Sequence, residues 1–591
     1  MKTINIAPKI EKAGCLVVGI IAAMASLFLS VVSLMHTTVV DDVKEGEGVM
    51  SVVYNIPERL ECVYYLNDNF ILNLLILAVL LLDAFLLIRH CKKIKLRTIC
   101  IGLFLWTFAL GIFWVLSSQC APTEDSATVT NASVAFAQND YAVLSDIRYF
   151  NEYPFQLGYV FFNEMILRFA GLFRKPDTLL ILEVLNAAFL GVIHLFLVLI
   201  TEKLLHDRRV TALAAVLLAL STAPLISCSF VYGIYPGMMF AVIAMYCEIC
   251  YLLDNKLPYA VIAALSITLA VMVKPNYMIW MIAMLLIAAV CMLKRKKYLR
   301  DGIYIVLTAV LACSIQPLVI RGYEKASGVD IKGTVPYIGW IAMGINETDL
   351  APGWYNVRYT IGLIEEADFN EEVAKERGWE LVRERVDFLL HHPQYTSDFF
   401  YLKNVSQWND TAYESIWNNT VRGQYKDKGK FAAWVCGDGE STVKKIMDLF
   451  AQLVFFGFFI GCIRLLREKN FMLTPLPVVF IGGFLYHMIS EGKSQYVLPY
   501  FIAMTGFAAA GIVWLGDLFV RRLKPDHLLY GALGGSQFLL EPAAESHAEP
   551  VKAEAEPESP ANNAETPADA KPDAPKQQKS GNKKNKKKKK R

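Results

Sequence analysis

Runs of about twenty apolar residues recur along this chain of 591 residues, and short polar or charged segments separate them. A helix of ~20 apolar residues is long enough to cross the ~30 Å hydrocarbon core of a bilayer. The pattern predicts about twelve spans, at roughly 14–35, 70–89, 98–117, 178–200, 210–229, 236–253, 258–273, 275–293, 302–320, 447–466, 472–489 and 498–519. We therefore expect an all-α polytopic membrane protein with both termini inside.

The composition agrees with this pattern. Hydrophobic residues make up 55% of the chain and charged residues 19%, and the mean hydropathy is +0.38, which is atypical of a soluble protein. The formal net charge is +3, and the basic residues gather in short loops and in the tail. We expect the Lys-rich tail to face an anionic inner leaflet, with no nucleic acid as a partner.

Basic loops set the expected orientation. The loop between the second and third runs carries Arg89, Lys92, Lys93, Lys95 and Arg97, which places it in the cytoplasm by the positive-inside rule. The segment 118–177 is then outside. Within it, 155–173 is apolar enough to span but carries Glu164 and Arg168. If it spanned, the later basic loops would fall outside, so we interpret it as a helix on the outer surface.

The first run has a rival interpretation as a cleavable signal peptide. It is long for that purpose and has no clear A-x-A site, so an uncleaved first span is favoured.

The same patterns divide the chain into six segments. They are three N-terminal spans with an outer loop at 36–69 (1–117), a first outer loop with surface helices (118–177), a six-span core (178–320), a small extracytoplasmic domain (321–446), three C-terminal spans (447–520) and a disordered Lys-rich cytoplasmic tail (541–591). In the extracytoplasmic domain, apolar residues recur at helical spacing around Glu371–Leu390, at Val373, Leu381, Val382, Val386, Leu389 and Leu390.

The first outer loop is rich in acids and aromatic residues. An enzyme whose sugar donor is attached to a lipid phosphate needs a carboxylate at the outer membrane surface, which accepts the proton of an acceptor hydroxyl. Glu124, Asp125 and Asp140 are the catalytic candidates. Asp125 is preferred because it follows the span at 98–117 by about eight residues. An ordinary solvated loop residue or helix cap is an equally common use of each acid.

Two cations fall on the same side, each beside a span. Lys274 lies between two spans, and Lys493 lies in the short turn before the last span. Both are predicted to bind the donor phosphate, although a charge at a span end can simply reach toward the headgroups. Side chains that stack on or hydrogen-bond sugars are predicted substrate contacts: Tyr153, Gln156, Gln495, Tyr496, Trp354 and Trp408.

Three segments carry a resemblance to a known family. Pro122-Thr123-Glu124-Asp125, Tyr153-Pro154-Phe155-Gln156-Leu157-Gly158 and Lys493-Ser494-Gln495-Tyr496-Val497-Leu498-Pro499 resemble parts of the GT-C integral membrane glycosyltransferases. The likeness is to glycosyltransferase family 39, which groups protein mannosyltransferases and aminoarabinose transferases. The chain departs from that family in having two spans before the one at 98–117 and no paired prolines in the Tyr-Pro segment.

The resemblance implies a membrane glycosyltransferase of the bacterial cell envelope. Its donor would be a polyprenyl-phosphate-linked sugar, its acceptor an extracytoplasmic glycan, lipid or protein, and its transfer inverting, with no metal or cofactor. A polysaccharide polymerase and a lipid-linked sugar flippase or transporter are the alternatives. A transporter would show internal symmetry and charged or broken mid-span sites, whereas most of these spans are free of charge.

The twelve cysteines show no metal-binding spacing. Cys62, Cys120 and Cys436 are predicted to face outward, so a disulfide among them stays open.

Overall fold

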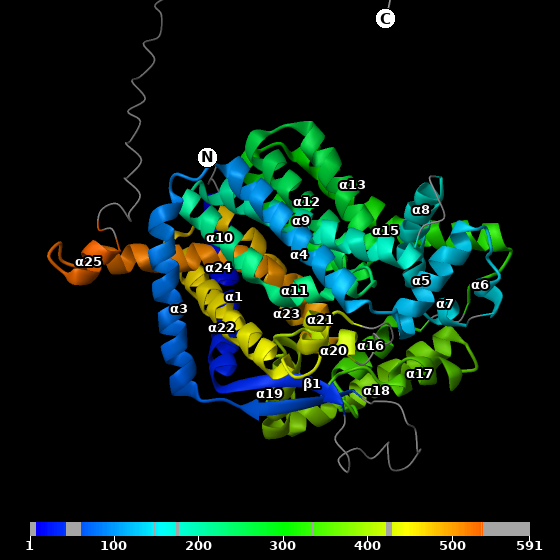
Figure 1. Ribbon diagram of the computed structural model, residues 1–591. Helices are drawn as coiled ribbons and strands as arrows, with labels where there is room; N and C mark the ends of the chain where they lie inside the picture. Colours follow the sequence, from blue (N-terminus) through cyan, green and yellow to red (C-terminus); the bar gives the residue numbers. More distant parts are fainter. Residues whose placement is uncertain are drawn as a thin grey trace, which may run out of the picture. The chain divides into compact units, whose positions relative to one another are not determined.

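A computed structural model describes residues 7–42, 61–146, 148–172, 177–332, 335–420, 428–533 and 535. The described part is built almost entirely of α-helices, with one two-stranded antiparallel sheet (Figure 1). The predicted tail at 541–591 lies outside the described residues.

Nine described helices are long and apolar enough to cross a membrane. They are α1 (Ala7–Met35), α3 (Phe70–Cys91), α4 (Leu96–Ser118), α9 (Thr178–Leu205), α12 (Ile234–Asp254), α14 (Met278–Arg295) with the turn η3 (Pro275–Tyr277), α15 (Tyr298–Ser327), α22 (Glu440–Glu468) and α24 (Ser494–Arg522). A pair bent by 50° would be a tenth span, and it consists of α10 (Arg208–Leu220) with α11 (Thr222–Ile226) and η2 (Ser227–Ser229). Two shorter apolar helices are α13 (Leu257–Val273) and α23 (Pro475–Ile489).

Every predicted apolar run coincides with one of these helices or with the bent pair. The chain is therefore a multi-pass, all-α membrane protein, while the number of twelve crossings stays a prediction. Polar residues begin several of the helices: Asn69 accepts a hydrogen bond from the amide of Leu72 at 3.1 Å, and Asp177 accepts one from the amide of Leu180 at 3.1 Å. Such caps satisfy amides that have no partner within the helix.

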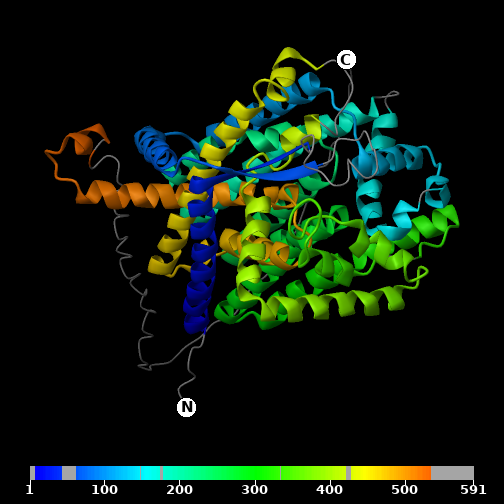
Figure 2. The same ribbon diagram turned by 90° about the horizontal axis from the view of Figure 1, so that it is seen from below.

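Helix α24 is the centre of the bundle. It packs against α22, α10 and α23, and Figures 1 and 2 show it (orange) running between them. Glycines permit the closest approach, because a Cβ on Gly511 would lie only 2.0 Å from the carbonyl oxygen of Gly457 on α22. Small residues at such crossings let two backbones meet where no hydrophobic driving force separates helix from lipid.

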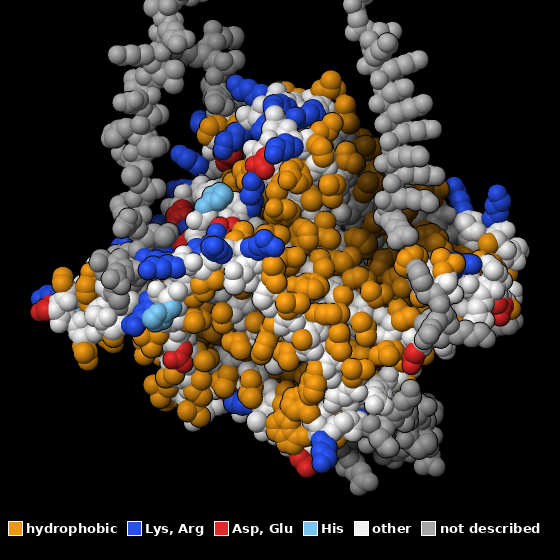
Figure 3. Space-filling view, turned by 45° about the horizontal axis from the view of Figure 1, so that its top comes forward, with side chains coloured by type: hydrophobic (Ala, Val, Ile, Leu, Met, Phe, Trp, Pro, Cys, Tyr) orange, Lys and Arg blue, Asp and Glu red, His pale blue; other side chains and the backbone are white. Residues whose placement is uncertain are grey.

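The lateral surface is apolar. On α3, the side chains of Ile71, Leu75 and Val79 are exposed, and Figure 3 shows hydrophobic side chains over most of one face, with Lys and Arg side chains gathered toward its upper part. In water such a face would be a large exposed patch, whereas lipid tails cover it at no cost.

The polar segments between the apolar helices fold into helices of their own. The first outer loop forms α5 (Glu124–Ala137), α6 (Val143–Asp146), α7 (Tyr149–Glu152), η1 (Pro154–Gln156) and α8 (Leu157–Gly171). The later domain forms α16 (Tyr337–Gly344), η4 (Val357–Tyr359), α17 (Ile361–Glu365), α18 (Glu371–His391), α19 (Pro393–Trp408), α20 (Ser415–Thr420) and α21 (Lys430–Val435). The remaining short elements are η5 (Phe471–Leu473) and α25 (Leu528–Ala532). The two polar segments touch, since Arg148 pairs with Glu365 at 3.1 Å.

The sheet is an addition to the predicted all-α fold. Strands β1 (His36–Asp42) and β2 (Glu61–Asn67) pair antiparallel. Strand β1 also contacts α19, because Oγ1 of Thr38 donates to the carbonyl of Val405 at 3.1 Å, and its Thr38 amide donates to the carbonyl of Asn409, the residue after α19, at 3.2 Å. The predicted outer loop at 36–69 thus holds a hairpin that ties the first span to the later domain.

Two further segments singled out in the sequence are helical, and the position of 155–173 on the outer surface stays a prediction. Helix α18 matches the predicted amphipathic segment, and its buried positions are Ala374, Gly378, Val382 and Leu389. Three residues assigned to its apolar face, Val373, Val386 and Leu390, are exposed instead, so the buried stripe is narrower than predicted. Helix α8 covers the ambiguous segment with 15 residues and is not among the candidate spans.

The structure has no disulfide bond among Cys62, Cys120 and Cys436. All twelve thiols are free, and Sγ of Cys120 donates to Oδ1 of Asn419 at 2.8 Å.

The predicted orientation has a direct test. Single cysteines at Asp140 and Tyr355 are expected to react with a membrane-impermeant maleimide in intact cells, and cysteines at Lys296 and Lys586 only after permeabilisation. The background needs three native cysteines replaced: Cys62 and Cys436, which are partly exposed and predicted to face outward, and the exposed Cys313. Labelling of the Lys296 position from outside would turn α8 into a span and invert the chain beyond it.

Candidate active site

Asp125 is held at the start of a short helix. It lies in the first turn of α5, where the unpaired helix amides favour a negative charge. Its side chain is exposed, and its Oδ2 accepts a hydrogen bond from the hydroxyl of Tyr232 at 2.8 Å. The carboxylate is therefore oriented by a neighbour while remaining open to a substrate.

A chain of polar groups extends from Tyr232 to the predicted Tyr-Pro segment. Nε2 of Gln156 donates to the hydroxyl of Tyr232 at 2.7 Å and to that of Tyr149 at 3.2 Å. Burial, together with the nearby Asp125 carboxylate, raises the pKa of Tyr149 and of Tyr232. Both phenols thus stay protonated and can act as hydrogen-bond donors.

Lys274 lies across from Asp125, between α13 and η3. Its ammonium nitrogen is 4.4 Å from the ring centroid of Tyr232 and 5.2 Å from that of Tyr496, which is within cation–π range. The side chain is half-buried, and burial lowers the pKa of Lys274 to about 8, opposed by Glu491 and Asp125. Among the described residues, no carboxylate oxygen lies within 4.0 Å of this ammonium.

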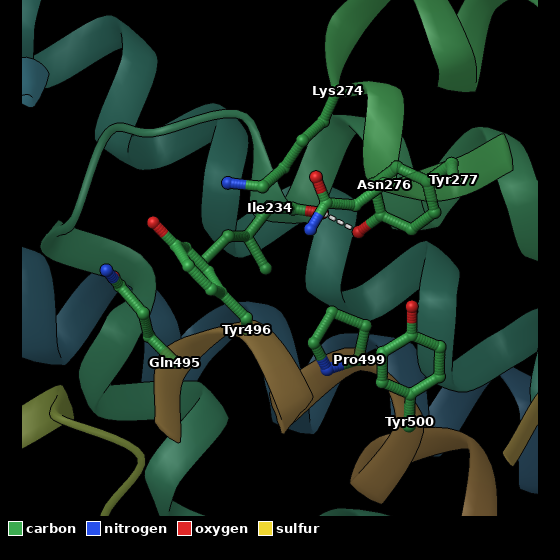
Figure 4. A pocket seen from close by; sticks show the side chains of 8 residues that line it. All are labelled: Ile234, Lys274, Asn276, Tyr277, Gln495, Tyr496, Pro499 and Tyr500. Atoms are coloured by element: carbon green, nitrogen blue, oxygen red, sulfur yellow. Dashed lines mark hydrogen bonds between the residues drawn. The ribbon is translucent and has the colours of Figure 1, made fainter. Parts of the chain in front are cut away.

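A small pocket opens beside Lys274 (Figure 4). It is lined from three directions, by the start of α12, by the turn from α13 into α14 and by the first turns of α24, and its residues are Ile234, Lys274, Asn276, Tyr277, Gln495, Tyr496, Pro499 and Tyr500. The Tyr277 hydroxyl donates to the carbonyl of Ile234 at 2.6 Å, so α14 is tied to α12 here. We call the space shared by Asp125, Lys274 and this pocket the polar recess.

A close backbone contact positions the recess. A Cβ added to Gly158 would lie 1.9 Å from the carbonyl oxygen of Met272, two residues before Lys274. Only glycine at this position therefore lets α8, and with it Gln156, reach the end of α13.

Gly158→Ala is accordingly expected to destabilise the protein by more than about 2 kcal/mol, because the new methyl group would clash with backbone atoms that cannot move away without distorting α13. Thermal unfolding in detergent measures the effect. Gly171→Ala in the same helix is the matched control, since a Cβ there meets nothing within 4 Å. Equal melting temperatures for the two variants would contradict the contact.

Sequence analysis assigned no role to Glu491, a carboxylate whose charge interacts with those of Asp125 and Lys274. It lies in the turn between α23 and α24, next to the predicted cation Lys493. Burial raises the pKa of Glu491 to about 7, with Lys493 and Lys274 opposing the shift and Asp125 adding to it. The sequence signal for Glu491 was its place in the same short turn as the candidate cation Lys493.

The other predicted cation, Lys493, points to buried acids. Its ammonium lies 3.4 Å from Oε2 of Glu414, and both side chains are buried. Ser494 Oγ donates to Oδ2 of Asp410 at 2.6 Å and to Oε1 of Glu414 at 3.2 Å. The ion pair makes Lys493 part of the support of the recess, and its contact with a donor phosphate stays a prediction.

Lys493→Ala is expected to lower the free energy of unfolding by about 3–5 kcal/mol, because it removes a cation from a buried pair. Chemical denaturation in detergent measures this. The double variant Lys493→Met/Glu414→Gln should recover a large part of the loss, since it removes both charges. Unchanged stability of Lys493→Ala, with weaker donor binding alone, would contradict the structural role.

The two other predicted catalytic acids differ in their distance from the recess. Glu124 is exposed and adjacent to Asp125, in the left-handed conformation with φ 49°. Asp140 is exposed beyond the far end of α5, about 20 Å away at 1.5 Å per residue, and its Oδ1 accepts the amide of Ala142 at 3.1 Å. The structure brings Asp125, but not Asp140, to the recess.

The predicted substrate contacts divide into two groups. Gln156, Gln495 and Tyr496 lie at the recess, and the Tyr153 hydroxyl lies 3.4 Å from that of Tyr355. Trp354 and Trp408 are instead fully buried. Trp408 packs between Phe480 and Phe484 at 5.5 and 5.8 Å, and Trp354 donates to Oγ of Ser406 at 2.8 Å. Both are core residues, which corrects their assignment as sugar contacts.

No group of three or more His, Cys, Asp or Glu side chains within the described ranges is placed to hold a metal ion.

No family model matches the chain, and no curated protein matches it. The solved structures that it resembles include the archaeal oligosaccharyltransferase AglB from Archaeoglobus fulgidus in complex with an inhibitory peptide and a dolichol-phosphate, at 15% identity and a TM-score of 0.39 over 75% of this chain and 52% of that one. The apo form of the Archaeoglobus fulgidus oligosaccharyltransferase gives 15% identity and a TM-score of 0.36, with the same coverage.

This chain thus spans about half the length of those proteins. A likeness at these TM-scores decides neither the activity nor the family, and it gives no support to glycosyltransferase family 39 in particular.

Proposed function

We propose that this protein is a membrane glycosyltransferase that moves a sugar from a polyprenyl-phosphate donor to an extracytoplasmic glycan, lipid or protein. One observation carries the proposal: an exposed carboxylate, Asp125, and an ammonium without an ion pair among the described residues, Lys274, face one recess. The recess adjoins the ends of apolar helices, where a lipid-borne substrate would present its headgroup.

Asp125 is the proposed general base. The acceptor oxygen attacks the anomeric carbon, the Asp125 carboxylate takes the hydroxyl proton, and the bond from the anomeric carbon to the phosphate oxygen breaks with its electron pair leaving on the phosphate. A single displacement of this kind inverts the anomeric centre. The hydrogen bond from Tyr232 fixes the carboxylate, and Oδ1 can then face the acceptor.

Lys274 is the proposed contact of the departing phosphate. Negative charge grows on the phosphate oxygens as the bond breaks, and a fixed ammonium in partly dry surroundings stabilises that charge more than water would. The two tyrosine rings hold the ammonium in place before the substrate arrives. Little reorganisation is then needed during the reaction.

Polar and aromatic groups around the recess would bind the sugars. Gln495 and Tyr496 line the pocket beside Lys274, and Tyr153 contributes a phenol next to Tyr355. Amide groups bond sugar hydroxyls, and aromatic faces stack on the apolar faces of sugar rings. We place the protein in a bacterial cell membrane, with its Lys-rich tail toward the anionic inner leaflet.

Mass spectrometry of surface glycans tests the function without knowledge of the sugar. A strain lacking the gene should lose a defined sugar mass from one glycan class, lipid or protein. Wild type and Asp140→Asn should restore that mass, and Asp125→Asn should not. Restoration by Asp125→Asn, or loss of a whole polymer in place of one sugar, would favour another activity, the second outcome pointing to a polymerase.

A further inference from the structure

Two carboxamides in the pocket beside Lys274 have no partner in the fold. Gln495 is only 5% exposed, and its Oε1 is buried without a hydrogen-bond partner. Its Nε2 and the side chain of Asn276 also make no hydrogen bond to any residue that the structure describes. Both residues line the pocket together with Lys274. Because a buried amide without a partner destabilises a fold, the pair points to a ligand that supplies the missing bonds.

The backbone fixes both carboxamides in place. Gln495 lies in the first turn of α24, where its amide donates to Oε1 of Glu414 at 3.4 Å. Asn276 lies in the turn η3, which connects α13 to α14. In Figure 4, the polar ends of Lys274, Tyr496 and Gln495 extend toward the same side of the pocket, and Asn276 enters it from another direction. A ligand held by Lys274 would therefore lie within reach of the carboxamides.

The size of the pocket limits what can enter it. Its volume is about 10 Å³, which holds the centre of one water-sized group. Ile234, Tyr277, Pro499 and Tyr500 form the rest of its wall. A single hydroxyl fits this space, whereas a phosphate or an acetamido group is too large. An ionised phosphate also offers only acceptors, and the buried Oε1 of Gln495 requires a donor.

Resting on the proposed function, we propose that this pocket binds the hydroxyl on C2 of the donor sugar, the ring carbon next to the anomeric carbon. When Lys274 holds the phosphate, the anomeric carbon lies beside the pocket, and the hydroxyl on C2 is the nearest hydroxyl of the ring. It donates to Oε1 of Gln495 and accepts from Nδ2 of Asn276. The substrate class is then sugars with a free hydroxyl on C2, and 2-deoxy and 2-acetamido sugars are rejected.

Calorimetry on the full chain in nonionic detergent tests this selectivity. The probes are dodecyl phosphate esters of glucose, mannose, 2-deoxyglucose and N-acetylglucosamine, joined through the anomeric carbon in both configurations. Since 2-deoxyglucose lacks only the hydroxyl at which glucose and mannose differ, it is the matched analogue of both. The tighter-binding of the glucose and mannose probes should exceed the 2-deoxyglucose probe by roughly 10–100-fold, and the N-acetylglucosamine probe by at least about tenfold.

Gln495→Met should remove the preference for a hydroxyl on C2 over hydrogen, because the thioether is a poor acceptor of about the same length. The variant is expected to fold with a melting temperature no lower than that of wild type, since the carboxamide bonds no described residue. Gln394→Met is the matched control. Gln394 is exposed on α19, away from the pocket lining, so this variant should keep the full preference.

Two results would overturn the role of Gln495 and leave the phosphate site standing. One is equal affinity of wild type for the 2-deoxyglucose probe and the better hydroxyl-bearing probe, which would mean that the pocket holds only a water molecule. The other is tightest binding of the N-acetylglucosamine probe. Lys274→Met should bind every probe more weakly than wild type. Equal affinity of wild type and Lys274→Met, or no binding of any probe, would overturn the proposed function as well.

Discussion

Asp125→Asn is expected to lower turnover by about 10²–10⁴-fold, because the amide keeps the size and polarity of the side chain but cannot accept the acceptor's proton. Donor binding should be little changed or tighter, since the substitution removes a negative charge from the recess. The drop should therefore lie in kcat. Initial rates of sugar transfer by purified, folded protein measure it.

Asp140→Asn is the matched control in the same outer loop. Its carboxylate is exposed and bonds the amide of Ala142, so its loss should change the rate by less than about threefold. If Asp140→Asn were inactive and Asp125→Asn active, the base would have been assigned to the wrong end of α5. Glu124→Gln, next to Asp125 and also exposed, should resemble Asp140→Asn.

Lys274→Met is the second variant with a large expected effect. A charge-assisted contact to phosphate is worth about 1.5–3 kcal/mol, so kcat/KM should fall by roughly 10–150-fold. Because the ammonium stabilises charge that grows as the phosphate leaves, part of the loss should appear in kcat. Rates at several donor concentrations separate the two parameters.

Lys274→Arg distinguishes charge from shape. The guanidinium keeps the charge and stacks on the rings of Tyr232 and Tyr496, so it should recover a substantial part of the activity. It should also hold its charge above pH 8, where burial deprotonates Lys274, and thereby extend activity to higher pH. A Lys274→Arg variant as inactive as Lys274→Met would argue against a phosphate contact.

The membrane helices could be predicted from sequence because hydropathy is a local property. Helix α9, for example, carries an apolar window between an N-cap at Asp177 and a last turn at Lys203. The hairpin of β1 and β2 could not be predicted in this way. Its strands have seven residues each, and β1 gains partners from α19, more than 360 residues later.

The same difference between local sequence signals and long-range contacts applies to the residues of the candidate site. Asp125 follows an apolar run by about eight residues and Lys274 follows one directly, so the sequence alone predicts both near the membrane surface, and their roles stay predictions. Tyr232 could not be predicted, since its partner Asp125 is 107 residues away. Lys493 was assigned a substrate without knowledge of Glu414, and Trp408 without knowledge of Phe480. Tertiary contacts decide whether a cation or an indole faces a ligand or the core.

Release of polyprenyl phosphate tests the central claim most directly. Purified protein is incubated with lipid-linked sugars extracted from its own membranes and with the acceptor fraction, and free polyprenyl phosphate is measured by mass spectrometry. Wild type and Asp140→Asn should release it in step with sugar appearing on the acceptor, and Asp125→Asn should release at most about a hundredth as much. Equal release by wild type and Asp125→Asn, or no release by any folded variant, would contradict glycosyl transfer at this recess.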